Sequence, residues 1–538
     1  MNSKYLGLTI GPIIKTLSMA RKPRELWSAS YLFSHLMKML INEIPDTENI
    51  LSPATGVTDK SVGLFPDRLF YKSELGIDSF SKLIGKVKGE FALELKILQD
   101  YFNVYAVEIE AKSDSEAIKV LNEELDYLEL YNVAYNIKNK DISEEVRSLI
   151  FKKKDSKLFE LAELSNNQLE VDTLAEIASS QLRSIHGTVY DVCVKESKIC
   201  EEREGKDCII KDLKKKFPNN KKKMNPNNFI TPHKYVCVVY ADGDNIGKAC
   251  TSINGDKLKD LSQLLLNFGT KACKNIRDFQ GMPIYAGGDD LLFISPVISG
   301  KKEEEQTIFD LIKTLDSTFK EEVTKIFEWK DKEGKDLQKP SMSFGVSITY
   351  YKYPLYEALN ISRDLLFGKA KHVDGKNAIA WTLQKNSGSA VNGQFSKTTN
   401  EKGEPNGVYK KFIALLESIN VSMDENFVSA VPHKIQASEV LLGTLMGDSK
   451  KTFQPERLAA FFDNTLERKS KNKIEKAYLE AVEELLPAIH QSLLETNGKK
   501  KDKDRTIESE IIIETVENMY GILRTAKFIK GLEEDKDE

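Results

Sequence analysis

Several features that are common in proteins are missing from this sequence of 538 residues. It contains no run of about 18 or more apolar residues, so we expect no membrane-spanning helix. Its first residues, MNSKYLGLTIGP, lack a basic segment followed by a signal-length apolar core, and we therefore expect a cytoplasmic protein. A net charge of −4 argues against nucleic-acid binding through bulk electrostatics alone.

Histidine and cysteine are both scarce, with six residues of each, and no histidine is followed by aspartate. Cys193, Cys200 and Cys208 cluster in a polar stretch, but they form no CxxC pair, and their spacings of seven and eight residues fit structural zinc poorly. His186 or His233 could supply a fourth ligand. We nevertheless expect no zinc there, and we expect reduced thiols throughout.

What the sequence does contain is a pair of acidic sites. The apolar run YVCVVY, residues 235–240, is typical of a buried strand, and Asp242 follows at its carboxyl end. Between the apolar runs MPIYA and LLFIS, a hairpin turn is predicted at Gly287, Gly288, Asp289 and Asp290. If these strands are neighbours, three carboxylates meet, and one would take up a proton unless a cation neutralised them. Oxygen ligands without His or Cys suit Mg²⁺ or Mn²⁺, and two such ions roughly 3.5–4 Å apart serve in-line attack on a phosphoryl group.

Glycine and aspartate are also ordinary turn formers, so the order of the surrounding elements matters. Helical spacing of apolar residues occurs between the two acidic sites, at 258–276. We predict further elements in the order helix, strand, helix and strand, at 307–327, 341–351, 354–371 and 377–381. The whole order, βαββαβ with one more αβ unit, is that of a ferredoxin-like palm.

The motifs in this segment resemble a known family. YADGDNIGK (240–248), YAGGDDLLF (285–293), SFGVSI (343–348) and AKHVDGKNAI (370–379) are similar to the palm domain of GGDEF-type cyclases and of the large polymerase-like subunit of type III CRISPR effector complexes. GGDD in place of GGDEF, together with DGDNIGK, favours the CRISPR subunit. Near the N-terminus, residues 9–36 and the run GLFPDRLF (63–70) resemble the first palm of the Cmr-type (III-B) subunit.

The resemblance implies a role for each motif residue. It identifies Asp242, Asp289 and Asp290 as metal-binding catalytic acids, in agreement with the strand argument. Asp244 either joins this nucleotide site or caps the following turn. Backbone close to a triphosphate is expected at Gly243, and phosphate-binding N–H groups at Asn245, Ile246 and Gly247. Gly287 and Gly288 are expected to allow the same close approach of the backbone at the hairpin. Lys371 matches a phosphate-contacting lysine of the family, although a lysine near a helix end is usually only solvated.

The function implied is a target-RNA-activated nucleotidyltransferase that uses ATP and two Mg²⁺ or Mn²⁺ ions and releases pyrophosphate. Its product would be a cyclic oligoadenylate or AMP conjugated to S-adenosylmethionine. Its partners would be other Cmr-type subunits, crRNA and target RNA. Because no His-Asp pair occurs, we expect no HD-type nuclease activity. Two alternatives stay open, a non-catalytic scaffold subunit and a free-standing diguanylate-type cyclase.

The predicted fold class is α+β, with two ferredoxin-like palm domains and additional helical domains. The length corresponds to about three to four domains, and 41% hydrophobic residues suffice for their cores. We predict a degenerate first palm without an acidic pair at 1–112, in which residues 21–30 help to hold a second nucleotide. A helical linker at 113–232 and the catalytic palm at 233–385 follow. Residues 386–538 are predicted as a flexible loop, up to residue 407, and a helical domain with an apolar stripe at Leu479, Val482, Leu486, Ile489 and Leu493.

Overall fold

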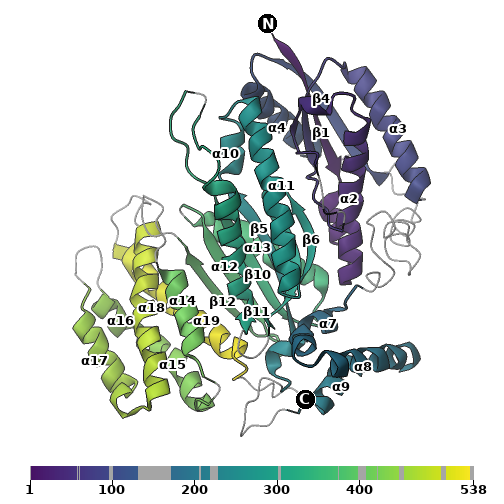
Figure 1. Ribbon diagram of the computed structural model, residues 1–538. Coiled ribbons are helices and arrows are strands. Elements are labelled where there is room, and N and C mark those ends of the chain that lie inside the picture. The colour runs from purple at the N-terminus through teal and green to yellow at the C-terminus, as the bar shows by residue number, and fades with distance from the viewer. Residues whose placement is uncertain are drawn as a thin grey trace.

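A computed structural model gives the fold of the chain (Figure 1). It describes residues 2–95 without 57, 58 and 60, then 101–130, 171–204, 208–218, 228–300, 305–397 without 332 and 374, 407–446 without 421, 453–497 and 505–532. The fold is mixed α+β, as predicted. Within these ranges, no helix combines the length and hydrophobicity that crossing a bilayer requires.

The first palm is a four-stranded sheet in the order β2-β3-β1-β4. Its strands are β1 (Ser3–Gly11), β2 (Ile50–Ser52), β3 (Arg68–Lys72) and β4 (Asn103–Ala111). Its helices are α1 (Ile13–Leu17), α2 (Pro23–Glu43), α3 (Ile77–Leu95) and α4 (Asp114–Leu130). Of the run GLFPDRLF (63–70), only the last three residues lie in a strand, because β3 begins at Arg68.

The second palm is a six-stranded sheet in the order β12-β11-β10-β5-β7-β6. Its strands are β5 (Tyr235–Asp244), β6 (Met282–Gly287), β7 (Asp290–Pro296), β10 (Ser341–Tyr350), β11 (Ala378–Gln384) and β12 (Ala390–Ser396). Its helices are α10 (Ile246–Cys250), α11 (Gly255–Asp278), α12 (Ile308–Phe319) and α13 (Leu355–Gly368), and a short ribbon of β8 (Ile298–Ser299) and β9 (Gln306–Thr307) precedes α12. The predicted order of strands and helices is confirmed, and β5 lies in the middle of the sheet, where its carboxyl end is flanked by β7 and β10.

Two elements extend the palms beyond the predicted domain boundaries. Helix α4 packs on β1 and β4, so the first palm continues past residue 112. Strand β12 pairs with β11, so the second sheet continues past residue 385 into a segment predicted as a loop. That prediction was wrong for 390–396. Glycine, asparagine and serine are typical of loops, but here they lie in a strand in which Gly393 leaves room for the Trp381 ring.

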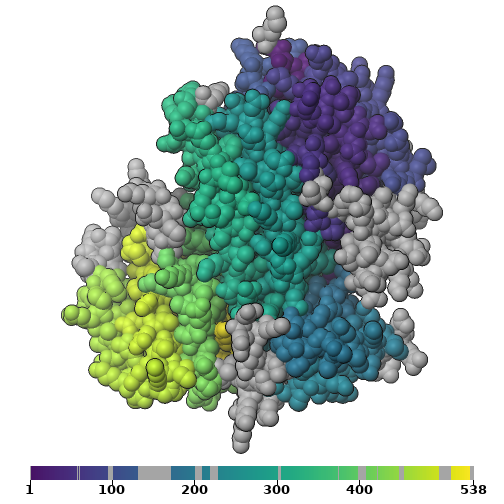
Figure 2. Space-filling model, in the orientation of Figure 1, coloured from purple at the N-terminus to yellow at the C-terminus, as the bar shows by residue number. Residues whose placement is uncertain are grey.

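Two groups of helices flank the second palm, and Figure 2 shows these parts of the chain at its lower right, in blue, and at its lower left, in green and yellow. On one side lie α7 (Leu174–Ala178), α8 (Ser180–Glu204) and α9 (Cys208–Lys216). A C-terminal bundle on the other side consists of α14 (Val408–Ser418), α15 (Glu425–Ala437), α16 (Glu439–Met446), α17 (Pro455–Thr465), α18 (Lys473–Asn497) and α19 (Arg505–Ile529). The apolar stripe lies on α18 and packs within the chain, since Leu479, Val482 and Leu486 are fully buried.

The three cysteines of the polar stretch lie on α8 and α9. Cys193 is buried with a free thiol, while the side chains of Cys200 and Cys208 lie outside the described residues. His186 stacks on Phe217 at a ring distance of 5.1 Å. Both ring nitrogens of His233 are engaged, because Nδ1 accepts the N–H of Ile230 and Nε2 lies 2.7 Å from Gln181 Oε1.

The palms are joined through backbone. Gly63 of the first palm forms a bridge to Tyr285 on β6, and the N–H of Ala286 donates to the Gly63 carbonyl at 3.0 Å. The first palm therefore continues the second sheet beside the GGDD hairpin.

Candidate active site

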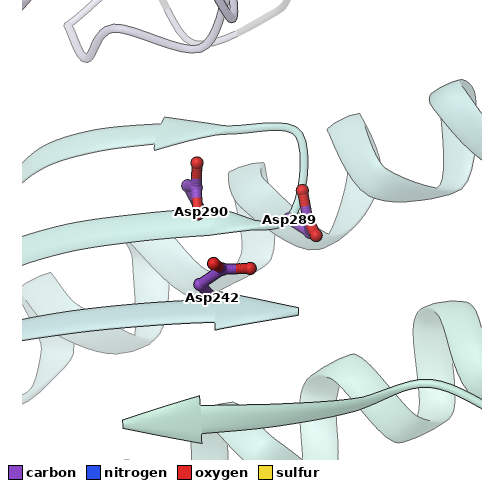
Figure 3. Close-up of side chains that lie close together, drawn as sticks. All are labelled: Asp242, Asp289 and Asp290. Carbon is purple, nitrogen blue, oxygen red and sulfur yellow. The ribbon is translucent and has the colours of Figure 1, made fainter. Parts of the chain in front are cut away.

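Three aspartates meet at one end of the second palm (Figure 3). Asp242 lies near the end of β5, Asp289 occupies the turn between β6 and β7, and Asp290 is the first residue of β7. Because Ala241 pairs with Leu291, the antiparallel register brings Asp242 beside Asp290. The ladder continues at the turn, where the Gly243 N–H donates to the Asp289 carbonyl at 3.2 Å.

The three carboxyl groups offer oxygens that all lie within 4.8 Å of one another. Among the described residues, no other group of three His, Cys, Asp or Glu side chains comes together in this way. A set of carboxylate oxygens without His or Cys suits Mg²⁺ or Mn²⁺. The donor set of this structure therefore fits the cations predicted from the sequence.

The electrostatics of the cluster favour proton or cation uptake. Burial and the Asp242 charge raise the pKa of Asp289 to about 7. Surrounding protein atoms and the charges of Asp242 and Asp289 raise the pKa of Asp290 well above its usual range, although its side chain is exposed at the surface. The shift is upward because like charges within 4.8 Å repel one another at any exposure.

One cation of the chain already contacts the cluster. Lys371, on the 3₁₀ turn η6 (Ala370–His372), forms an ion pair with Asp242, and its Nζ lies 3.3 Å from the Gly243 carbonyl oxygen. Burial raises the pKa of Asp242, while the Lys371 charge lowers it. The predicted phosphate-binding lysine is therefore brought to the acids, where it partly balances their charge.

The glycines of the site are required for close packing. A side chain on Gly243 would place its Cβ 2.7 Å from Asp289 Cβ, so the hairpin that carries Asp289 limits this position to glycine. At Gly287 an added Cβ would lie 2.3 Å from the Tyr285 hydroxyl. Gly288 has φ of +64°, which favours glycine at this turn position.

The predicted phosphate cradle follows β5 directly. Asn245 has a left-handed φ of 67° and starts the short helix α10 at Ile246. Because the first N–H groups of a helix have no partner within that helix, those of Ile246 and Gly247 are suited to bind oxygens of a ligand. Phosphate binding at these residues stays a prediction.

Asp244 is not part of the acidic cluster. It is fully buried and accepts hydrogen bonds from the hydroxyls of Ser341 and Ser343 on β10 and from the Asn377 N–H. Asp244 therefore bonds β10 and residue 377 and does not cap the turn that follows β5, and its place in the nucleotide site stays a prediction. Sequence reasoning missed its partners, because they come from strands about 100 residues away.

The first palm contributes an acid that sequence reasoning also missed. Asp67 directly precedes β3, as Asp290 begins β7, and its carbonyl accepts the N–H of Ile10 at 3.0 Å. Its charge reaches across the junction and raises the pKa of Asp290 and of Tyr285. The available signal was the Pro-Asp-Arg run just before an apolar strand.

The stretch predicted to hold a second nucleotide, residues 21–30, forms the start of α2. Trp27 is buried, stacks on Tyr31 at 4.9 Å and donates from Nε1 to the Ser61 carbonyl at 2.9 Å. Much of this stretch therefore serves the core of the first palm, and its contact with a nucleotide stays a prediction.

Comparison with known proteins places these features in a family. Residues 235–380 match the model of the Cas10/Cmr2 second palm domain, and residues 5–58 match that of the N-terminal region of the CRISPR-associated protein Cmr2. The CRISPR system Cmr subunit Cmr2 of Pyrococcus furiosus is 33% identical over 187 residues, which cover 29% of this chain and 19% of that protein. The match thus spans about a fifth of the length of this relative.

Solved structures share the fold over most of the chain. The apo state of type III-B Cmr-beta, determined by cryo-EM, aligns with a TM-score of 0.55 at 13% identity and covers 99% of this chain and 82% of its own. Cmr-beta bound to cognate target RNA gives 0.54 at 13% identity, with 88% and 79% covered. The crystal structure of a Csm1-Csm4 cassette in complex with cA4 gives 0.51 at 10% identity, with 91% and 70% covered.

The two matched regions are those that carry the first palm and the acidic cluster, and the fold of the whole chain agrees with them. The chain therefore carries a second palm domain of the Cas10/Cmr2 type and an N-terminal region similar to that of Cmr2, within a fold that Cmr-beta shares.

Proposed function

We propose that this chain is the nucleotidyltransferase of a type III-B CRISPR complex, which makes a signalling nucleotide from ATP when target RNA is bound. The observation that carries the proposal is the convergence of Asp242, Asp289 and Asp290 within 4.8 Å on the second palm. A scaffold has no reason to gather three carboxylates whose pKa values are raised by burial and, at Asp289 and Asp290, by the charges of their neighbours.

The similar solved structures support the proposal through the molecules with which they were determined. The Csm1-Csm4 cassette, which shares this fold, was solved with cA4, and Cmr-beta was solved with cognate target RNA. We infer that this chain likewise works with other Cmr-type subunits, crRNA and target RNA, and that its products are of the signalling-nucleotide class.

Each group of the site has a part in this chemistry. Asp242, Asp289 and Asp290 would hold two divalent ions, which lower the pKa of an attacking hydroxyl and stabilise the leaving pyrophosphate. Lys371 would exchange its ion pair with Asp242 for the phosphates of ATP. The N–H groups of the first turn of α10 would bind further phosphate oxygens. The first palm would hold the acceptor molecule at the junction beside the hairpin.

The experiment that tests the proposal uses the assembled complex with matching target RNA, Mg²⁺ or Mn²⁺ and labelled ATP, with and without S-adenosylmethionine, read by mass spectrometry. Product from ATP alone identifies an oligoadenylate synthase, and product only with S-adenosylmethionine identifies an AMP-conjugating enzyme. The variant with Asp289→Ala and Asp290→Ala should lose all product while it still assembles. Absence of product from the unaltered complex with either metal would leave a scaffold.

A further inference from the structure

Asp244 is a buried carboxylate that the acidic cluster does not use. It ends β5, two residues after Asp242, and its side chain is 0% exposed. A carboxylate removed from water is costly unless hydrogen bonds satisfy its oxygens. Here three donors do so, at 2.7 Å from Ser341 Oγ, 2.9 Å from Ser343 Oγ and 2.9 Å from the Asn377 N–H.

The third donor belongs to an unusual loop. Gly375, Lys376 and Asn377 have left-handed φ values of 82°, 55° and 50° in succession. Residues other than glycine rarely adopt such angles, so this conformation needs support from its surroundings. Asp244 supplies that support at the Asn377 N–H, and the Asn377 carbonyl in turn accepts the N–H of Lys397 at 2.8 Å.

The same loop leads from Lys371 to β11. At its start, Lys371 is paired with Asp242 and lies 3.3 Å from the Gly243 carbonyl. At its end, Asn377 is held by Asp244. The last three residues of β5 therefore contact both Lys371 and Asn377, so a shift of Asn377 would be passed along the chain toward Lys371.

We propose that Asp244 is a positioning residue, which anchors the loop after Lys371 so that the Lys371 ammonium stays against Asp242. This inference rests on the function proposed above for Lys371 and the three acids. A role as a metal ligand does not suit Asp244, because its carboxylate already accepts three hydrogen bonds and the described acids that lie within 4.8 Å of one another are Asp242, Asp289 and Asp290.

The first test is hydrogen exchange on the full-length chain with Asp244→Ala. Alanine offers no acceptor to the three donors, so the amides of the described residues in 371–378 should exchange about tenfold faster while the remaining amides of the second palm stay unchanged. Ser343→Ala removes one donor and should loosen the same segment to a smaller extent. Its matched control is Ser347→Ala, also fully buried on β10, whose hydroxyl has no hydrogen-bond partner.

The second test is a double-mutant cycle read by Mn²⁺ binding to the nucleotide-free chain. Because Lys371 competes with a cation for Asp242, Asp244→Ala should tighten Mn²⁺ binding several-fold when Lys371 is present. This gain should disappear in a Lys371→Met background, where the residue through which Asp244 acts is gone.

Four results would overturn the positioning role. They are unchanged exchange in 371–378, faster exchange across the whole palm, an equal change of Mn²⁺ affinity in both backgrounds, and weaker Mn²⁺ binding, which would make Asp244 a ligand. None of these measurements depends on turnover. If they succeed while the unaltered complex makes no product, the proposed function fails and the positioning role stands.

Discussion

Replacing Lys371 by methionine should tighten the binding of Mn²⁺ to the nucleotide-free protein. The Lys371 ammonium is ion-paired with Asp242, one of the three predicted ligands. A divalent ion must separate this pair before Asp242 can contribute an oxygen. The lysine that is predicted to bind phosphate in the loaded site therefore opposes the metal in the empty one.

The size of the effect follows from the burial of the pair. The side chains of Lys371 and Asp242 are only 15% and 17% exposed, so water screens the contact less than it screens a surface ion pair. A hydrogen bond to a charged group contributes about 1.5–3 kcal/mol. Removing this competitor should lower the Mn²⁺ dissociation constant by about 10- to 100-fold. Asp242 without its lysine also holds a proton more readily, which reduces the gain, so all variants are compared at one alkaline pH.

The assay is a titration of free Mn²⁺ by electron paramagnetic resonance, with and without ATP. Lys376→Met is the matched control, because Lys376 lies in the same loop and acts on Asp242 through its charge alone. We expect that control to change the dissociation constant by less than about threefold, since charges without direct contact are screened. With ATP present, Lys371→Met should bind the nucleotide more weakly than the unaltered chain.

Two results would refute this reasoning. Unchanged or weaker Mn²⁺ binding in Lys371→Met would mean that the lysine orients Asp242 as a ligand instead of competing with the ion. An equal gain in Lys376→Met would mean that only the overall charge of the loop matters.

Two further predictions concern the hairpin and the junction with α8. Gly243→Ala should abolish Mn²⁺ binding and product formation in a folded protein, because its Cβ would lie 2.7 Å from Asp289 Cβ; Gly89→Ala, on α3 and with no described atom within 4 Å of the new Cβ, is the control. Burial lowers the pKa of His233 to about 3. Since histidine in an unfolded chain titrates near pH ~6.5, this contribution to stability is complete above that pH and is lost as the pH falls toward 3, by about 2 kcal/mol between pH 7 and pH 5. Urea denaturation at both pH values measures the free energy of unfolding. Between pH 7 and pH 5 it should fall by about 2 kcal/mol less in His233→Asn than in the unaltered chain. An equal fall in the two proteins would contradict a neutral His233.

The acids of the site could be found from the sequence because their positions follow from local rules. A run of apolar residues ends at Asp242, and a glycine-rich turn between two apolar runs carries Asp289 and Asp290. The element order then predicted that these strands are neighbours, and the pairing of β5 with β7 confirms it. Lys371 was reached only through its motif, since nothing local shows that the end of α13 turns toward β5.

The features of the site that the sequence did not reveal depend on the pairing of strands that are far apart in the chain. The partners of Asp244 lie on β10 and before β11, and only the pairing of Asp244 with Ser341 brings them together. Strand β12 lacks the apolar alternation of a half-buried strand, because it covers Trp381 with a glycine. Asp67 belongs to the other palm, and its place beside the hairpin depends on the bridge between Gly63 and Tyr285.

The site as a whole is rigid in its backbone and unbalanced in its charge. The Gly243–Asp289 hydrogen bond and the anchored loop fix where the carboxyl groups stand, while one lysine faces three acids. The repulsion among the three carboxylates destabilises the fold unless a cation is bound. A ligand that binds only the folded state stabilises that state. Mn²⁺ should therefore raise the melting temperature of the unaltered chain, and it should have no effect on the variant with Asp289→Ala and Asp290→Ala. If the stabilisation persisted in that variant, the ion would be bound elsewhere, and the acids would no longer support the proposed chemistry.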